Sequence, residues 1–171
     1  MSFPARLELD FLPHFHEPDA PGEWRLGARL ELGPDTFTVT VSGPLTRSPA
    51  PPHPPGRVEA LWRHDVVEVF LLGDDDRYLE LELGPHGHYW LLALHGCRNI
   101  VGEPAPLHHA WRQDAGRWEA SIMLPATALP PGLRALNVTC ILGTGRFHGS
   151  FVPLPGERPD FHQLARFHFP G

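Results

Sequence analysis

Hydrophobic and polar residues alternate along most of the chain, which is the pattern of strands that bury one face. In residues 5–12 the apolar positions are Leu7, Leu9 and Phe11, and the same period of two recurs in eight further segments. Those segments are residues 24–32, 36–41, 61–72, 77–83, 88–94, 117–124, 135–142 and 146–152. Residues 125–129 and 161–166 favour short helical turns instead. The pattern predicts an all-β chain, a single antiparallel β-sandwich of about nine or more strands with one or two short helical turns, forming one domain over residues 1–171.

The composition agrees with short strands and turns. The 171 residues include 17 glycines and 21 prolines, more than a fifth of the chain, which counts against a helical bundle because both residues destabilise helix interiors. Hydrophobic residues make up 42%, with five tryptophans and ten phenylalanines, so a packed core is expected rather than disorder. Residues 48–56 contain five prolines and are predicted to form a stiff surface loop.

The charge balance excludes some classes of partner. Asp and Glu number 20 against 14 basic residues, all of them Arg, which gives a net charge of −6. Without a basic run the chain lacks the electrostatic footprint of a nucleic-acid or anionic-membrane binder, and no apolar stretch approaches the roughly 20 residues that span a bilayer. No secretory signal is visible in residues 1–10, so a cytoplasmic location is expected, with Cys97 and Cys140 reduced.

Candidate chemistry is concentrated in residues 61–71 and 77–83. If Val67, Val69 and Leu71 face the core, strand alternation places one set of side chains together on the opposite, outward face. That set is Trp62, Glu68, Tyr78, Glu80 and Glu82. An aromatic ring beside carboxylates is the chemistry of a sugar site, because the ring stacks on the apolar face of a pyranose while the carboxylates accept hydrogen bonds from hydroxyls.

These residues also carry a resemblance to a known family. Trp62, then Asp65, then Val-Glu-Val-Phe at residues 67–70 resembles the motif of family 9 carbohydrate-binding modules and related DOMON-like sandwiches. Residues 116–125, 136–138 and 159–162 are similar to other parts of the same pattern. The resemblance implies a β-sandwich that binds a sugar between two aromatic rings, with charged and amide side chains holding the hydroxyls.

The resemblance assigns roles to individual positions. Trp62 matches one aromatic platform, Glu68 matches a hydroxyl-binding acid, and Phe161 stands where the family has a second platform, a tryptophan. Two positions depart from the pattern: Glu80 stands where a sugar-binding arginine is expected, and Arg158 stands where an amide is expected. Since arginine donates hydrogen bonds and glutamate accepts them, the fold is expected to transfer better than the ligand.

We therefore predict non-catalytic binding of a small polar ligand, with a carbohydrate as the favoured class. Trp62 and Phe161 are predicted to flank the ligand, while Glu68, Glu80 and Arg98 hold its hydroxyls or amines. The proline-rich loop at residues 48–56 leads towards this strand and is expected to form one wall of the site.

Other interpretations of the same residues stay open. Glu68 and Glu80 on adjacent strands could serve as acid and base of a glycoside-processing enzyme, which needs two carboxylates about 5 to 10 Å apart. The chain could also be a protein-interaction sandwich without a small-molecule site, with Trp62 and Phe161 as plain packing residues. Glu68 could simply pair with Arg63, Arg77 or Arg98, and Asp65 is expected to order a turn or bind an arginine.

No metal or cofactor is predicted. The histidine pairs at residues 14/16, 86/88 and 108/109 have no third ligand at a diagnostic spacing. Haem would need an axial ligand such as Met123, which lies in a strand predicted to face the core. Among catalytic motifs, neither a nucleophile elbow at Ser150 nor a dinucleotide loop at residues 143–145 has the required pattern.

Overall fold

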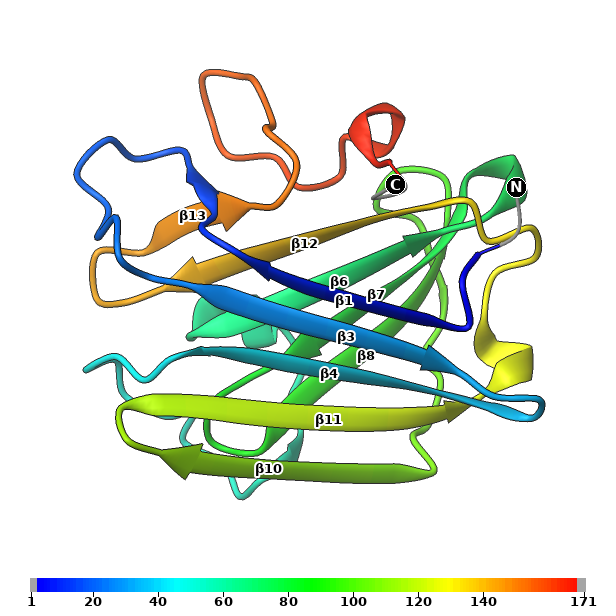
Figure 1. Cartoon of the computed structure of the whole chain (residues 1–171), viewed down its shortest axis with the longest axis horizontal. Helices are drawn as coiled ribbons and strands as arrows, with labels where there is room; N and C mark the ends of the chain where they lie inside the picture. The colour runs from blue at the N-terminus through cyan, green and yellow to red at the C-terminus, as the bar shows by residue number, and fades with distance from the viewer. Residues whose placement is uncertain (1–2, 169–171) are drawn as a thin grey trace.

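Two β-sheets packed face to face make up the fold of this computed structural model (Figure 1). The structure describes residues 3–168, so Met1, Ser2 and residues 169–171 of the predicted domain lie outside it. The smaller sheet has the order β1-β3-β4-β11-β10, and these strands are Arg6–Phe11, Leu26–Leu32, Thr36–Pro44, Arg117–Pro125 and His108–Asp114. The larger sheet has the order β2-β13-β12-β6-β7-β8-β5, and these strands are His14–Phe15, Phe147–Ser150, Ala135–Leu142, Val66–Leu72, Arg77–Leu83, His88–His95 and Gly56–Arg57. A short strand, β9 (Ile100–Gly102), pairs with β8.

The predicted antiparallel β-sandwich is confirmed. Each of the nine segments with alternating hydrophobicity contains a strand, and in the described residues only the two-residue β5 pairs in parallel, with β8. The two predicted helical turns are 3-10 helices, η3 (Ala126–Ala128) and η4 (Leu164–Arg166), and a third, η2 (Asp74–Asp76), forms the turn between β6 and β7. Within residues 3–168 no helix has the length and apolar character needed to cross a membrane.

The first part of the predicted strand at residues 61–72 is wrong, because it forms a 3-10 turn. This turn, η1 (Leu61–Arg63), follows Ala60, whose φ of 56° lies in the left-handed region and breaks the extended backbone. Strand β6 begins only at Val66. Trp62 therefore projects from a turn, and strand alternation does not decide where its ring lies.

Four strands were not predicted from the sequence. Strands β2, β5 and β9 are two or three residues long, too short to show a period. The seven-residue β10 lies at a sheet edge and is largely exposed, so its sequence HHAWRQD does not alternate between apolar and polar residues. Because β10 is held mainly by backbone hydrogen bonds to β11, its sequence carries no alternating hydrophobic pattern.

The main core lies between the sheets, where the predicted alternation is confirmed. Val67, Val69 and Leu71 of β6 are buried together with leucines of β7, and they pack in one cluster with β3, β4 and β11, including Trp118. Burial of each such side chain stabilises the fold by about 1.5–3 kcal/mol. This core fixes which face of β6 and β7 points away from the smaller sheet.

The opposite face of the larger sheet is not the solvated surface that alternating glutamates and leucines suggest. A second cluster of buried residues covers it, including Phe70 and Tyr78, with Phe161, Leu164 and Phe167 of the C-terminal segment packed there. The segment is joined to the sheet by backbone hydrogen bonds between Leu136 and His168. The glutamates that share this face are consequently buried.

Candidate functional site

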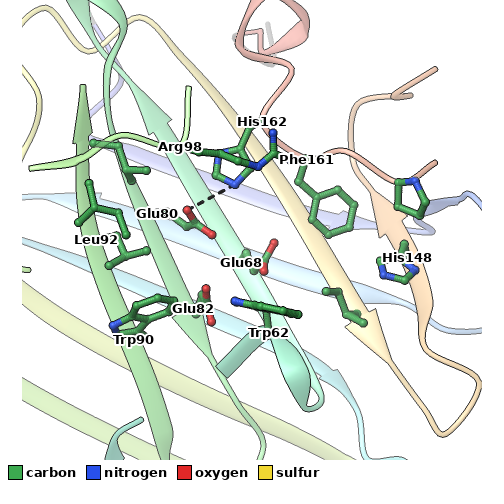
Figure 2. Close-up of a pocket in the computed structure, with 14 residues that line it drawn as sticks. Trp62, Glu68, Glu80, Glu82, Trp90, Leu92, Arg98, His148, Phe161 and His162 are labelled. Atoms are coloured by element: carbon green, nitrogen blue, oxygen red, sulfur yellow. Dashed lines mark ion pairs between the residues drawn. The ribbon is translucent and has the colours of Figure 1, made fainter. Parts of the chain in front are cut away.

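A cavity of about 450 Å³ opens on the covered face of the larger sheet (Figure 2). Its floor is formed by three glutamates from β6 and β7, Glu68, Glu80 and Glu82, hereafter the glutamate triad. The remaining lining residues are aromatic, aliphatic or basic: Trp62, Trp90, Phe161, Leu92, Leu94, Ile100, Ile141, Pro159, Arg98, His148 and His162. The C-terminal segment and η1 bring aromatic side chains to a floor that the sheet alone would leave open.

Strand register brings the triad together. Glu68 of β6 lies directly opposite Glu82 of β7, and Glu80 lies opposite Phe70, the next residue on the same face of β6. On the two neighbouring strands, Trp90 of β8 pairs with Glu82, and Thr139 of β12 pairs with Glu68. The same alternation that sends Val and Leu side chains into the main core therefore sends three carboxylates into one small region.

The triad is deeply buried. Glu82 is 0% exposed, and Glu68 and Glu80 are also buried, with one carboxylate oxygen of each lying within 4.8 Å of the others. Thr139 Oγ1 donates a 2.6 Å hydrogen bond to Glu68 Oε2. His162 Nε2 lies 3.7 Å from Glu80 Oε2. Neither oxygen of Glu82 has a hydrogen-bond partner of normal geometry among the described residues.

Burial and mutual repulsion raise the pKa of each carboxyl of the triad. Burial raises the pKa of Glu68 to about 7, although the Thr139 hydroxyl and the charge of Arg146 act in the opposite direction. Burial and the charge of Glu68 raise the pKa of Glu80 to about 8. Burial and both neighbouring glutamates raise the pKa of Glu82 well above its ordinary value. Near neutral pH the cavity floor therefore favours bound protons or another positive charge over three bare carboxylates.

Trp62 is held at the cavity by its backbone. The Arg146 guanidinium donates hydrogen bonds to the carbonyls of Trp62 and His64. Asp65 accepts hydrogen bonds from the backbone N–H of Gly143 at 2.8 Å and from the hydroxyl of Thr46 at 2.6 Å, so it orders the backbone as predicted. These contacts tie η1 to the turn between β12 and β13.

The Trp62 ring itself stays accessible. It is 43% exposed and lines the cavity, with the Arg63 guanidinium 5.3 Å from its ring centroid. Figure 2 shows the indole beside the side chains of Glu68 and Glu82. The accessible ring therefore offers a stacking surface directly beside buried hydrogen-bond acceptors.

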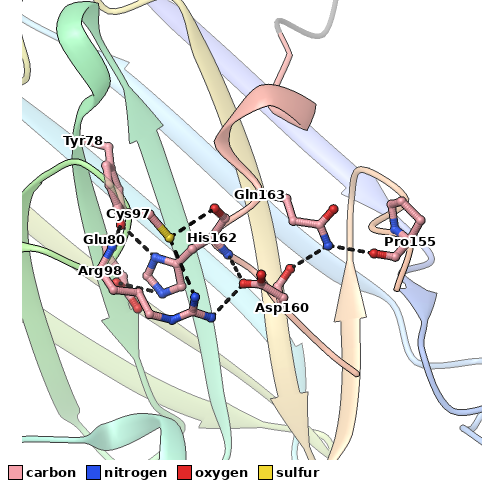
Figure 3. A network of polar contacts seen from close by, with 8 residues as sticks. All are labelled: Tyr78, Glu80, Cys97, Arg98, Pro155, Asp160, His162 and Gln163. Atoms are coloured by element: carbon pink, nitrogen blue, oxygen red, sulfur yellow. Dashed lines mark hydrogen bonds and ion pairs between the residues drawn. The ribbon is translucent and has the colours of Figure 1, made fainter. Parts of the chain in front are cut away.

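A polar network closes the other side of the cavity (Figure 3). The Tyr78 hydroxyl accepts a 3.0 Å hydrogen bond from the backbone N–H of Arg98 and lies 2.8 Å from His162 Nδ1. The Arg98 guanidinium pairs with Asp160 at 2.7 Å, and the same Asp160 oxygen accepts a hydrogen bond from the His162 backbone. Burial, followed by the charge of Arg98, lowers the pKa of His162 to about 4, so its imidazole is neutral at neutral pH.

The five predicted site residues line this one cavity: Trp62, Glu68, Glu80, Arg98 and Phe161. None of the three arginines considered as partners of Glu68 forms an ion pair with it within residues 3–168; Arg98 pairs with Asp160 instead. One expectation about its walls is wrong: no residue of the proline-rich loop lines the cavity, and the loop is anchored elsewhere by a hydrogen bond from His88 to the His53 carbonyl. Arg158, which stands where the resemblance has an amide, is not a lining residue either.

Several lining residues were missed from the predicted site. Glu82 and Trp90 could have been found from strand parity, since they share the face of Glu68 and lie in register with it. His162 follows Phe161 directly but reaches Glu80 only because the C-terminal segment folds back over the sheet. His148 lies on the short strand β13 and gave no signal in the sequence.

The triad is also the group of side chains with the geometry of a metal site. Among the described His, Cys, Asp and Glu residues, these three glutamates bring one ligand atom each into a single cluster. None of the histidine pairs at residues 14/16, 86/88 and 108/109 takes part in such a cluster within residues 3–168. Three carboxylate oxygens are ligands suited to hard cations rather than to haem or zinc.

Two solved structures align with most of this chain. A candidate carbohydrate-binding protein from Bacteroides uniformis matches 95% of this chain and 84% of its own, with a TM-score of 0.67 and 18% sequence identity. A family 9 carbohydrate-binding module from Caldicellulosiruptor kristjanssonii, in complex with glucose, aligns over 91% of this chain and 79% of its own, with a TM-score of 0.46 and 10% identity. The first likeness shows that the chain is a β-sandwich of the type seen in the Bacteroides protein.

Sequence relatives identify the family. The human UPF0462 protein C4orf33 is 34% identical over 178 residues, which covers 98% of this chain and 86% of the human protein. Its Danio rerio homologue is 33% identical, covering 98% of this chain and 87% of the fish protein. The chain belongs to the UPF0462 family. No family model matches the sequence.

Proposed function

We propose that this protein binds a carbohydrate in the cavity over the glutamate triad without transforming it chemically. The observation that carries the proposal is the accessible Trp62 ring beside three buried carboxylates. A pyranose needs both features, because its C–H face stacks on an aromatic ring while its hydroxyls require hydrogen-bond partners. A volume of about 450 Å³ falls within the range of roughly 300–1,000 Å³ found for small-molecule sites.

The polar groups of the cavity can pair with sugar hydroxyls both as acceptors and as donors of hydrogen bonds. An ionised glutamate accepts hydrogen bonds from hydroxyls, and a protonated one also donates to a ring or hydroxyl oxygen. Arg98 at the rim adds a donor, because its guanidinium is only partly occupied by Asp160. Phe161 provides a second aromatic surface from the C-terminal segment. The carbohydrate-binding description of the Bacteroides uniformis protein, which shares the fold, agrees with this proposal.

The glycosidase alternative fits the arrangement less well. A glycosidase places two carboxyls on either side of the scissile bond, one as acid and the other ionised as nucleophile or base. Glu68 and Glu80 come from adjacent strands and lie side by side on the same face of the sheet (Figure 2). The pKa of each is raised, to about 7 and about 8, so neither is the firmly ionised partner that the mechanism requires.

A buried Trp62 with no groove beside it would have favoured the protein-interaction alternative. Trp62 is instead 43% exposed at the edge of a cavity. A flat docking surface also has no use for three buried carboxylates, which are unfavourable to bury without a partner. These features favour a small polar ligand over a protein partner.

The test is a calorimetric titration of the full chain with a panel of neutral mono- and disaccharides. Saturable binding to at least one sugar is expected, and Trp62→Ala should weaken it at least tenfold. Trp111→Ala is the matched control, because Trp111 is equally exposed, at 44%, but does not line this cavity. No binding across the panel, or equal losses in both variants, would refute the proposal.

A second measurement separates binding from catalysis. Activated aryl glycosides of the sugars that bind are incubated with the protein and with Glu68→Gln. We expect no release of the aryl group by either protein. Turnover by the unmutated chain that disappears in Glu68→Gln would show that the glycosidase alternative is correct.

A further inference from the structure

The glutamate triad lacks the positive partner that buried carboxylates normally have. The chain contains no lysine, and within residues 3–168 no arginine forms an ion pair with the triad. The nearest histidine is His162, whose Nε2 lies 3.7 Å from Glu80 Oε2 and whose Nδ1 contacts the Tyr78 hydroxyl at 2.8 Å. Buried charges without a partner are strongly unfavourable, so the site is complete only when something positive occupies it.

Glu82 is the sharpest sign of a missing ligand. Its side chain is 0% exposed and points into the cavity floor, yet neither carboxylate oxygen has a hydrogen-bond partner of normal geometry among the described residues (Figure 2). The backbone of Trp62 and the carboxyl of Glu80 approach it closely enough to shift its pKa as weak hydrogen-bond partners, but neither contact has normal hydrogen-bond geometry. A fully buried carboxylate with such weak donors favours a cation or a donor from outside the chain.

We propose that Glu68, Glu80 and Glu82 hold a hard divalent cation, with Ca²⁺ the best match, on the floor of the cavity. One oxygen from each glutamate lies within 4.8 Å of the other two. Three oxygens around one cation with ligands at about 2.3–2.6 Å lie at most about 4.0–4.5 Å apart, so this cluster needs at most small side-chain movements to hold Ca²⁺. Mg²⁺, with ligands at about 2.0–2.1 Å in a near-ideal octahedron, demands a tighter and more rigid arrangement.

The ligand set also separates Ca²⁺ from softer metals. Three carboxylates give an all-oxygen environment, whereas Zn²⁺ prefers a tetrahedron with cysteine or histidine ligands. Cys97 and His162 both have other contacts. The Cys97 thiol lies 3.8 Å from the His162 carbonyl, and His162 Nδ1 contacts the Tyr78 hydroxyl. Neither belongs to the cluster of ligand atoms.

The position of the site gives the cation a role in binding. Ca²⁺ takes about six to eight oxygen ligands, more than three glutamates supply, so coordination positions would face the cavity beside Trp62. Water or the hydroxyls of an organic ligand could occupy them. The cation site does not depend on the ligand being a carbohydrate, because the three carboxylates alone would form it.

The experiment uses the full chain, stripped of metal with a chelator and titrated with CaCl₂ alone in a calorimeter. Binding of one Ca²⁺ per chain is expected, with a rise in Tm when Ca²⁺ is in excess. Glu82→Gln and Glu68→Gln should each weaken Ca²⁺ binding at least tenfold. Asp75→Asn is the control, because it removes one charge from the exposed acidic turn η2, and it should bind as the unmutated chain does.

The variants also guard against loss of folding. Glu82→Gln replaces an unpartnered carboxylate by a neutral side chain of the same shape, so its Tm without metal should equal or exceed that of the unmutated chain. Absence of saturable Ca²⁺ binding would overturn the proposal, and so would binding that Asp75→Asn removes and Glu82→Gln does not. Titrations with MgCl₂ and ZnCl₂ complete the test, since tighter binding of either would overturn the assignment to Ca²⁺.

Discussion

Glu68 and Glu82 face each other directly across β6 and β7, and both side chains are buried. Like charges at directly opposite positions of an antiparallel pair destabilise a sheet. The Thr139 hydroxyl partly compensates Glu68, but Glu82 has no comparable donor among the described residues. The fold therefore sacrifices stability at the floor of its cavity, as proteins commonly do at functional sites.

Glu82→Gln should stabilise the metal-free protein by about 1–2 kcal/mol, because it removes one of three mutually repelling buried carboxyls without changing the shape of the side chain. Urea unfolding at pH 8, in the presence of a chelator, measures the effect. Glu157→Gln, at an exposed loop position, is the control and should change stability by less than about 0.5 kcal/mol. A clear loss of stability in Glu82→Gln would show that the Glu82 carboxylate has a partner that stabilises it.

The stability of the metal-free protein should fall by about 2–3 kcal/mol between pH 6.5 and 8.5. In this range the unfolded glutamates are ionised, whereas the folded chain still holds protons on Glu68 and Glu80, whose pKa values are raised to about 7 and about 8. The folded state then binds more protons than the unfolded state, so stability decreases as pH rises. Arg98 and Arg146 face these groups and reduce the effect without reversing it.

His162 acts in the opposite direction. Burial lowers its pKa to about 4, so between about pH 4 and 6.5 the unfolded histidine binds more protons than the folded one. Over most of that range Glu68 and Glu80 each hold a proton in the folded chain that they have lost in the unfolded chain, so His162 offsets only part of their effect and stability already falls with rising pH below pH 6.5. Urea unfolding across the range in one buffer series should show a steeper fall near pH 7 than near pH 5. Constant stability from pH 6.5 to 8.5 would mean that the triad is already ionised in the folded chain.

Much of this site could be predicted from local sequence, and the rest depends on contacts between distant segments. Period-two alternation places Glu68, Glu80 and Glu82 on one face, because it is a property of any extended strand. The same pattern cannot say whether that face meets water, and here Phe161 and its neighbours return from the C-terminus to cover it. The alternation of glutamates and leucines therefore predicted correctly which face of the sheet carries the glutamates, but it predicted that this face is exposed to solvent, and it is buried.

Trp62 shows the opposite case, in which a site residue was found although its local structure was predicted wrongly. The motif pointed to an aromatic residue before Asp65, but Ala60 adopts a left-handed conformation and turns the chain into η1. Alanine carries no sequence signal for such a conformation, unlike glycine or asparagine. The residue thus lines the cavity from a turn rather than from the strand.

Asp65→Asn should lower stability by about 1–3 kcal/mol and disturb the Trp62 platform. The Asp65 carboxylate accepts from the Gly143 backbone N–H and the Thr46 hydroxyl, and an amide can accept on only one of its two terminal atoms. Gly143 holds a φ of 75°, which leaves the β12–β13 turn little freedom to find another acceptor. Unfolding measurements and the exchange rate of the Gly143 amide report the two effects.

Thr46→Val is the comparison for that variant, because it removes one of the two hydrogen bonds and leaves the Gly143 contact intact. It should lower stability by less than Asp65→Asn and leave Gly143 protected from exchange. Equal effects of the two variants would contradict a role for Asp65 in holding the turn.

Tyr78→Phe should loosen the C-terminal segment over the cavity while leaving the sandwich folded. The Tyr78 hydroxyl joins the backbone of Arg98 to the His162 ring, and its removal leaves both without that partner at the cavity edge. A loss of about 1–2 kcal/mol in global stability is expected. Hydrogen exchange should accelerate at residues 160–167 more than in β3 or β4, whose main-core packing does not involve Tyr78. Tyr89→Phe on β8 is the matched control, because it removes a tyrosine hydroxyl outside this network, and uniform acceleration in both variants would show that Tyr78 contributes to packing alone.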